Sequence, residues 1–265
     1  MLLSVQNLSS VGIIHRATNP GEVLIETKTP GYPRIIFVGK GLLPGGNWVG
    51  KAAANDGGPL GTYLREINEE LSFGNSVVDP DEMDTLFGSG HLGHPPEKHL
   101  RLIEATLEDK ETLFDIKDAI TVNVELFGVF LQDVPKWVFN SGDPENKAGD
   151  YRGAVSVFSV PLPDKIWFQL VELQARYGNL SNESQTFMTS AEEIVEKKIQ
   201  IGWGQDRVLQ KHFLLHGIKG ATKMSLMAGI SSIELIGYPL SSYHEYLQIF
   251  DIQKIPDSIQ RLVAT

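Results

Sequence analysis

The chain contains no cysteine, which excludes disulfide bonds and thiolate chemistry. It also has no apolar run close to the roughly 20 residues that a membrane-spanning helix requires, so no membrane partner is expected. Its first residues, Met1-Leu2-Leu3-Ser4, lack the basic segment and the long apolar segment of a secretory signal. Together these absences predict a cytoplasmic protein.

Positive charge is scarce. Lys and Arg number 23 against 33 Asp and Glu, which gives a formal net charge of −10. Proteins that bind the nucleic-acid backbone need a basic surface, so no nucleic-acid partner is expected. A small phosphorylated ligand is not excluded, because a bound metal ion and a few basic residues can reverse the sign of the charge within a pocket.

What the sequence does have is enough length and apolar content for a sizeable core. At 265 residues, with a hydrophobic share of 42%, the chain suits one large domain or one domain plus an extension. The clearest local pattern lies between Gly57 and Gly74. Pro59 suits the first turn of a helix, and apolar residues then recur at helical spacing: Leu60, Leu64, Ile67 and Leu71.

Glu66, Glu69 and Glu70 fall on the other face of this predicted helix, within one turn. Like charges at these spacings destabilise a helix by about 0.2–0.5 kcal/mol per pair. A hard divalent cation such as Mg²⁺ or Mn²⁺ removes that conflict, because it prefers oxygen ligands. The alternative is a solvated acidic face, which is the commoner fate of charge runs.

Two neighbouring features favour the metal site. Arg65 can hold a carboxylate in a fixed orientation through its planar guanidinium. Upstream, Leu43-Pro44-Gly45-Gly46 forms a glycine-rich approach to the helix. The whole pattern, a Pro-Gly-Gly turn followed by a helix that carries R-E-I-N-E-E-L-S-F, resembles the Nudix hydrolase box.

That box is usually written G-x5-E-x7-R-E-U-x-E-E-x-G-U, where U is a bulky apolar residue. Residues 65–70 and Phe73 fit its second half, whereas Ser72 replaces the second glycine. The first half is degenerate: the expected glycine falls on Lys51 and the expected glutamate on Gly57. The resemblance therefore covers the helix well and the preceding loop poorly.

The resemblance implies a fold of the α+β class, a Nudix-type α/β/α sandwich with a mixed sheet. It implies a Mg²⁺- or Mn²⁺-dependent hydrolase that cleaves a phosphoanhydride bond in a nucleoside diphosphate linked to another moiety. In that role Glu66, Arg65 and Glu69 are the candidate catalytic residues. The candidate metal ligands are Glu66, Glu69 and Glu70.

The substrate is then expected to be a small nucleotide, and the loop residues Gly45, Gly46 and Trp48 are the candidates to bind it. Trp48 either stacks on a base or plugs the loop. Nudix enzymes can also use an acidic residue outside the box as metal ligand or base. Glu145 and Asp150 are the candidates for this distal acid.

Alternation and turn residues predict the remaining elements. Strands are expected over residues 10–17, 22–27, 34–38, 100–107, 121–131 and 151–160. Helices are expected over residues 190–202, opened by a capping box at Ser190, and over 205–216 and 241–250. Residues 109–118 are expected to form a short turn or helix, and residues 180–188 a polar connector.

These elements predict a Nudix-like domain over residues 1–217, with loop insertions of which residues 47–58 are one. A mostly helical C-terminal extension is predicted over residues 218–265. This extension either packs on the main domain or serves as the interface of a homodimer.

Two other functions stay open. The first is a non-catalytic Nudix-like module that binds a nucleotide or metabolite and acts as a regulator, as the degenerate first half of the box and Ser72 suggest. Retention of Glu66, Glu69 and Glu70 favours the enzyme, because a pure binding protein has no need of three carboxylates that repel one another. The second is an acidic surface helix in an unrelated α/β domain.

Overall fold

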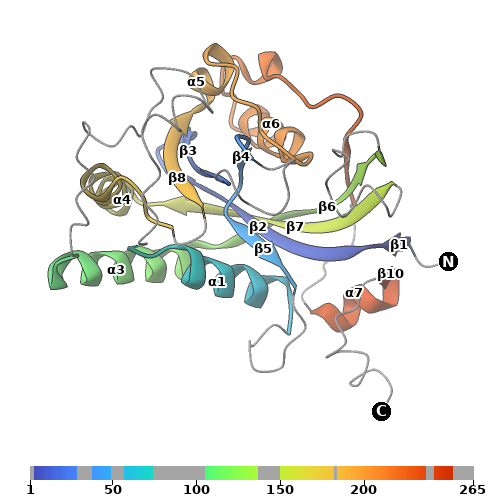
Figure 1. Cartoon of the computed structure of the whole chain (residues 1–265), viewed down its shortest axis with the longest axis horizontal. Coiled ribbons are helices and arrows are strands. Elements are labelled where there is room, and N and C mark those ends of the chain that lie inside the picture. Colours follow the sequence, from blue (N-terminus) through green and yellow to red (C-terminus); the bar gives the residue numbers. More distant parts are fainter. Residues whose placement is uncertain are drawn as a thin grey trace.

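The computed structural model describes residues 3–28, 38–48, 57–73, 105–136, 150–181, 184–236 and 242–252. Within these ranges eight strands form one mixed sheet, and two short strands form a separate pair. Helices cover both faces of the sheet (Figure 1). The predicted α/β/α sandwich with a mixed sheet is therefore confirmed. None of the helices in the described ranges is long and apolar enough to cross a membrane.

The large sheet is built around two long central strands. Its order is β4-β3-β2-β7-β6-β9, with β5 paired to β2 and β8 paired to β3. The strands are β2 (Asn7–Arg16), β3 (Asn19–Thr27), β4 (Gly41–Leu42), β5 (Gly45–Asn47), β6 (Glu125–Val134), β7 (Tyr151–Leu162), β8 (Gln185–Ser190) and β9 (Ser231–Glu234). β2 and β7 run parallel, and the other pairs in this sheet are antiparallel. The separate pair is β1 (Leu3–Val5) with β10 (Phe250–Ile252).

Helices flank this sheet as two layers. Their bounds are α1 (Pro59–Glu70), α3 (Leu107–Asn123), α4 (Asp164–Tyr177), α5 (Ala191–Glu196), α6 (Gln205–Leu215) and α7 (Tyr243–Ile249), with a short 3₁₀ turn η5 (Ala221–Lys223). Side chains alternate across a strand, so Ile13 and Ile14 of β2 enter different cores. Ile13 packs in the core of α5 and α6, and Ile14 in the core of α1, α3 and α4.

The structure confirms the helix ends that were predicted from capping residues. The Ser190 hydroxyl accepts a hydrogen bond from the Glu193 N–H, and the Glu193 carboxylate accepts one from the Ser190 N–H, both at 3.2 Å. This capping box opens α5 as predicted. Gly217 follows α6 in the left-handed region, at φ 66°, where glycine is the favoured residue.

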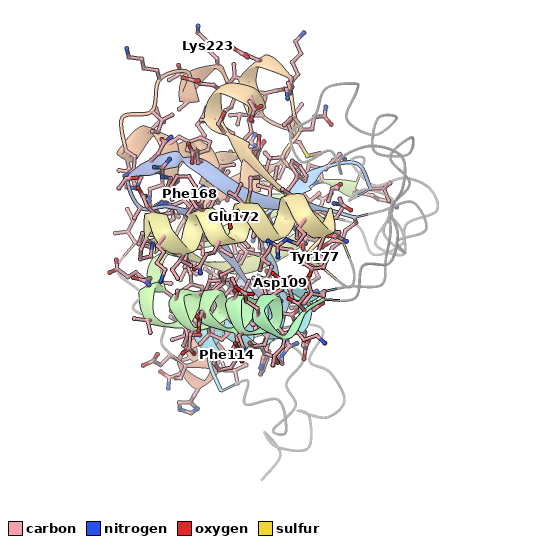
Figure 2. The ribbon with its side chains drawn as sticks, turned by 90° about the vertical axis from the view of Figure 1, so that its left-hand side faces the viewer. Asp109, Phe114, Phe168, Glu172, Tyr177 and Lys223 are labelled. Atoms are coloured by element: carbon pink, nitrogen blue, oxygen red, sulfur yellow. The ribbon has the colours of Figure 1, made fainter. Side chains whose placement is uncertain are left out.

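The predicted strand over residues 100–107 is wrong in its described part. Thr106 is instead the N-cap of α3, because its hydroxyl accepts a hydrogen bond from the Asp109 N–H at 3.1 Å. The short turn or helix predicted over residues 109–118 belongs to this longer helix. Asp109 also receives hydrogen bonds from Arg176 and Tyr177 of α4, so the side chain joins the two helices (Figure 2).

The strand predicted over residues 121–131 begins four residues late, at Glu125, because α3 continues to Asn123. β-branched residues at 120–124 favour a strand locally. Ile116 and Ile120, however, are fully buried on the helix face that packs on the sheet, and this burial outweighs local propensity.

The predicted polar connector over residues 180–188 contains the start of β8, which pairs along β3 from Glu22 opposite Ser190 to Thr27 opposite Gln185. The polar side chains of this strand are satisfied inside the protein. The Thr186 hydroxyl, for example, donates to the Gln174 side-chain oxygen at 2.8 Å. A buried polar strand of this kind lacks the apolar alternation by which strands are predicted.

The chain after residue 217 contributes to the same sheet. β9 pairs with β6 from Phe130 opposite Glu234 to Asp133 opposite Ser231. α7 places Tyr246 in a core cluster with Leu8. The described part of this region therefore contains two strands beside α7 and η5. The domain boundary at residue 217 and a homodimer interface stay predictions.

Three histidine rings lie together between β2 and α6. His212 lies 4.7 Å from His15 and 4.6 Å from His216, measured between ring centroids. His212 is fully buried, and its Nε2 bonds the Pro20 carbonyl at 3.1 Å. Burial, together with the charge that His15 can carry beside it, lowers the pKa of His212 to about 3. Burial likewise lowers the pKa of His15.

We predict that acid destabilises the fold through this cluster. An unfolded histidine binds its proton near pH 6.5, whereas folded His212 stays neutral down to about pH 3. Between those values the unfolded state binds more protons, so the free energy of unfolding falls as the pH falls. The variant His212→Gln should reduce this slope by up to about 1.4 kcal/mol per pH unit. Urea denaturation at a series of pH values from 7 to 4 measures it.

The exposed His244 of α7 provides the matched control. His244→Gln should leave the slope of stability against pH unchanged, because this side chain lies in solvent in both states. Equal slopes for His212→Gln and the unaltered chain would contradict the prediction.

Candidate active site

Helix α1 buries most of the face that its apolar spacing predicts: Ile67 and Leu71 are buried, and Leu64 packs against the same core. Leu60 was expected inside but is 41% exposed, and the buried face extends instead to Tyr63 and Glu70. The ring of Tyr63 stacks on Phe158 of β7 with centroids 5.3 Å apart, which fixes the rotation of the helix. This rotation carries one carboxylate, Glu70, into the interior.

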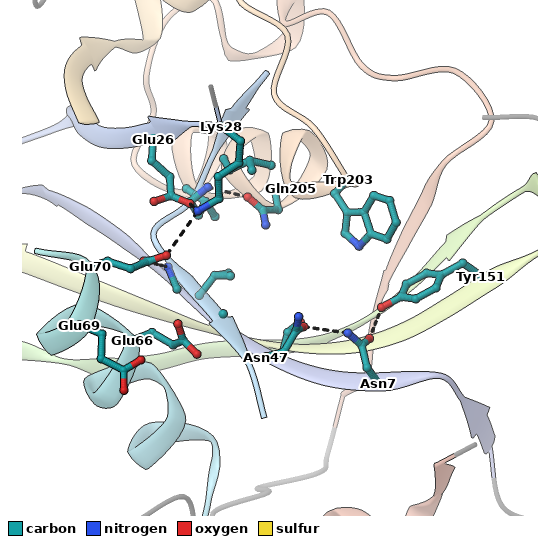
Figure 3. Close-up of a pocket in the computed structure, with 16 residues that line it drawn as sticks. Asn7, Glu26, Lys28, Asn47, Glu66, Glu69, Glu70, Tyr151, Trp203 and Gln205 are labelled. Atoms are coloured by element: carbon teal, nitrogen blue, oxygen red, sulfur yellow. Dashed lines mark hydrogen bonds and ion pairs between the residues drawn. The ribbon is translucent and has the colours of Figure 1, made fainter. Parts of the chain in front are cut away.

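The three glutamates of α1 consequently lie in different environments. The exposed fraction of the side chain is 59% for Glu69, 14% for Glu66 and 6% for Glu70. All three nevertheless line one cavity of about 350 Å³, as Figure 3 shows. The solvated acidic face that the sequence left open therefore describes Glu69 but not Glu70.

The cavity lies between α1, the strands β2, β3 and β5, and the start of α6. Its charged lining consists of Glu26, Lys28, Glu66, Glu69 and Glu70. Four carboxylates thus face one ammonium. An anionic ligand would be repelled from this wall unless additional positive charge entered with it.

Glu70 is held at the inner end of this wall by two partners. Its Oε1 lies 3.4 Å from Lys28 Nζ, and its Oε2 accepts a hydrogen bond from the Gly45 N–H at 3.1 Å. Burial raises the pKa of the Glu70 carboxyl well above its usual range. The negative charge of Glu26 adds to this rise, while Lys28 and the Gly45 N–H oppose it.

Arg65 holds the other two glutamates. Its guanidinium lies 2.6 Å from Glu66 Oε1 and 2.9 Å from Glu69 Oε2, and it donates to the Asn47 carbonyl at 3.0 Å. Arg65 is not among the lining residues of the cavity and connects α1 to β5. Its guanidinium therefore orients the Glu66 carboxylate.

Two glycines bring β5 against the acidic helix. Gly45 adopts φ +136°, and a Cβ there would lie 2.2 Å from the Ser10 carbonyl oxygen. A Cβ on Gly46 would lie 2.4 Å from the Glu66 carboxyl carbon. Both positions therefore need glycine for close approach. The sequence placed these glycines beside the acidic helix, and the structure brings them into the same cavity.

The opposite end of the cavity is aromatic and amide-lined. Asn7 Nδ2 donates to Asn47 Oδ1 at 2.8 Å, and the Tyr151 hydroxyl donates to Asn7 Oδ1 (Figure 3). The ring of Trp203 lies 4.9 Å from that of Tyr151. Trp203 has φ 59°, a region that bulky residues rarely occupy. Such strain often accompanies a functional position.

Sequence reasoning missed Glu26, Lys28 and Trp203. Glu26 and Lys28 come at the end of an ordinary alternating strand, and Trp203 precedes a helix. No local pattern distinguishes these residues from surface positions. Glu26 and Lys28 reach the cavity through the pairing of β3 and the docking of α1, and Trp203 through the turn before α6.

Other predicted site residues lie elsewhere. Trp48 packs beside Leu8 and Tyr246 in a core cluster and does not belong to the described cavity lining, which agrees with the plug rather than the stacking surface. Asp150 accepts a hydrogen bond from the Lys136 N–H at 2.8 Å and lines a neighbouring cavity. Glu145 lies outside the described residues.

The donor atoms of the cavity fit a hard divalent cation, because they are carboxylate oxygens. Among the residues that the structure describes, however, no three acidic or histidine side chains are arranged to hold a metal ion. Arg65 and Lys28 hold three of these carboxylates in ion pairs. A metal ion would have to draw at least Glu70 away from its present partner.

Comparison with known proteins adds little to this geometry. No family model matches the chain, and no curated protein matches it. A similar solved structure is a NUDIX hydrolase from Alicyclobacillus acidocaldarius, at 12% sequence identity and a TM-score of 0.39. The alignment covers 84% of this chain and 98% of that one. A TM-score and an identity this low do not establish a shared function.

We predict losses of stability of different size for alanine at Gly45 and at Gly46. Gly45→Ala should lower the free energy of unfolding by at least about 1–3 kcal/mol, because its Cβ would strike the backbone of β2, which cannot yield. Gly46→Ala should lower it much less, because the Glu66 side chain can swing aside. Chemical denaturation of both variants measures the difference.

Gly57→Ala is the matched control, because a Cβ there meets no atom within 4 Å. Its stability should equal that of the unaltered chain or exceed it slightly. The interpretation fails if Gly46→Ala is as unstable as Gly45→Ala.

Proposed function

We propose that the chain is a hydrolase of Nudix type that uses Mg²⁺ or Mn²⁺ to cleave a phosphoanhydride bond in a nucleoside diphosphate linked to another moiety. One observation carries the proposal. The carboxylates of Glu66, Glu69 and Glu70 share a single cavity with the backbone of Gly45 and Gly46. This is the combination of helix and loop that the R-E-x-x-E-E resemblance implies.

The charge of the cavity agrees with a cation-dependent reaction. A diphosphate cannot approach four carboxylates without positive charge to screen them. In the proposal, Glu66 and Glu70 hold the divalent ion, with Glu69 at the more exposed edge. When bound, the ion neutralises the phosphate oxygens and lowers the pKa of water.

The protein groups then have separate tasks. The oxygen of a water molecule bonds to phosphorus, the bridging P–O bond breaks, and the departing phosphate keeps the electron pair. Glu66 accepts the proton of the water, and Arg65 fixes the direction of that carboxylate. At the other end, Asn7, Tyr151 and Trp203 offer amide and aromatic contacts for the part of the substrate beyond the phosphates.

The remaining expectations are part of the same proposal. The partner is a small nucleotide rather than nucleic acid or a membrane, and the setting is cytoplasmic. The distal acid is unassigned among the described residues of this cavity, because Asp150 lines a different one. A homodimer is compatible with the proposal but not required by it.

A second candidate function is a binding module that no longer hydrolyses. It is favoured by one specific observation: Lys28 already pairs with both Glu70 and Glu26, with Nζ 3.4 Å and 2.9 Å from their oxygens. In this case the cavity would bind a nucleotide or metabolite without hydrolysing it. The two functions differ in whether a divalent cation supports turnover.

We expect Glu70→Gln to abolish most turnover and to leave the fold intact. Gln keeps an acceptor for the Gly45 N–H but removes the charged oxygen. The loss should exceed about 100-fold, since changing even the outer partners of metal ligands costs about 10–100-fold. The measurement is phosphate or nucleotide release from a panel of nucleoside diphosphate derivatives, with Mg²⁺, with Mn²⁺ and with chelator.

Glu172→Gln, on the exposed side of α4 (Figure 2), is the matched control and should retain full activity. Activity of Glu70→Gln equal to that of the unaltered chain would remove the hydrolase assignment. Thermal stabilisation by a nucleotide without any cleavage would favour the binding module.

A further inference from the structure

A lysine ammonium lies at the inner end of the cavity, between two buried carboxylates. Lys28 Nζ is 2.9 Å from Glu26 Oε1 and 3.4 Å from Glu70 Oε1. The exposed fractions of the three side chains are 7% for Lys28, 2% for Glu26 and 6% for Glu70. The ammonium therefore occupies a nearly dry position directly on the acidic wall (Figure 3).

The second oxygen of each carboxylate is held by a neutral donor. The Ser184 hydroxyl donates to Glu26 Oε2 at 2.7 Å, and the Gly45 N–H donates to Glu70 Oε2 at 3.1 Å. These hydrogen bonds orient the carboxylates but do not cancel their charge. Lys28 is the only one of these three partners that carries positive charge.

Buried carboxylates require a positive partner, because desolvation makes an isolated buried charge very unfavourable. A divalent ion and an ammonium meet that requirement in the same way and at the same oxygens. Glu70 cannot present its Oε1 fully to a metal ion while Lys28 holds it. The two cations are therefore expected to compete.

We propose that Lys28 is a built-in cation that competes with divalent metal for Glu70 and Glu26, and thereby weakens metal binding to the acidic helix. The proposal rests on the metal site of the proposed function but not on hydrolysis. A purely structural ion pair makes the opposite prediction, because removing its cation would disorder the carboxylates and weaken any metal site.

The test is binding of Mn²⁺ to the purified full chain without nucleotide, followed by the electron paramagnetic resonance signal of free Mn²⁺. Lys28→Met keeps the length and apolar stem of the side chain and removes its charge. We expect Lys28→Met to lower the Kd for Mn²⁺ at least tenfold. Lys223→Met, which removes an exposed lysine of η5 (Figure 2) outside the cavity lining, is the control and should leave the Kd unchanged.

A second variant keeps the test decisive if Lys28→Met does not fold. Lys28→Met leaves two buried carboxylates without their cation, which could prevent folding. The double variant Lys28→Met with Glu26→Gln keeps the net charge of the trio at the −1 of the unaltered chain, and it should also bind Mn²⁺ more tightly. Adding Glu70→Gln to either variant should cancel the gain, which locates the metal at Glu70.

Each result decides the proposal. A Kd that stays unchanged or rises in the folded variants overturns it, and a lower Kd that Glu70→Gln does not reverse overturns it too. Its outcome is separate from that of the hydrolase. If the Lys28 variants bind Mn²⁺ more tightly but the unaltered chain hydrolyses nothing, the competition is supported and the hydrolase assignment is rejected. If the unaltered chain shows metal-dependent hydrolysis but the Kd of the variants is unchanged, the hydrolase assignment is supported and the competition is rejected.

Discussion

The cavity of this protein depends on one buried set of charges, in which the Lys28 ammonium lies between Glu26 and Glu70. Glu26 belongs to β3, Lys28 follows it, and Glu70 ends α1. The Gly45 N–H adds β5 to the same set through Glu70. Charges this deeply buried are tolerated only when paired and hydrogen-bonded, so strand, helix and loop have to meet in this arrangement.

The glutamates of the acidic helix α1 are paired with two different cations. Arg65 orients Glu66 and Glu69 near the mouth, while Lys28 holds Glu70 at the inner end. Every carboxylate that the sequence offers to a metal ion thus has a protein cation beside it. In the function that we propose, an incoming divalent ion has to replace one of those cations, and Glu70 is the carboxylate at which we propose that this exchange takes place.

Features that arise from interactions between residues close in the sequence could be predicted, whereas features that arise from contacts between distant segments could not. Pro59 and the helical spacing of apolar residues predicted α1, and Ser190 with Glu193 predicted the start of α5, because these signals act within a few residues. The strand predicted over residues 121–131 begins late because burial of α3 against the sheet overrode local propensity. β8 was missed because its polar side chains find partners only in the folded protein.

The sequence by itself determined the acidic helix and the glycines that approach it, since both follow from local spacing, and the resemblance of this segment to the Nudix box implied the α/β/α class. It did not determine which glutamate is buried. That was decided by the rotation of α1, which Tyr63 fixes by stacking on Phe158. It did not reveal the role of Lys28 either, because Lys28 and Glu70 are 42 residues apart. No local rule links residues at that separation, and only the docking of α1 against β3 brings the ammonium to the carboxylate.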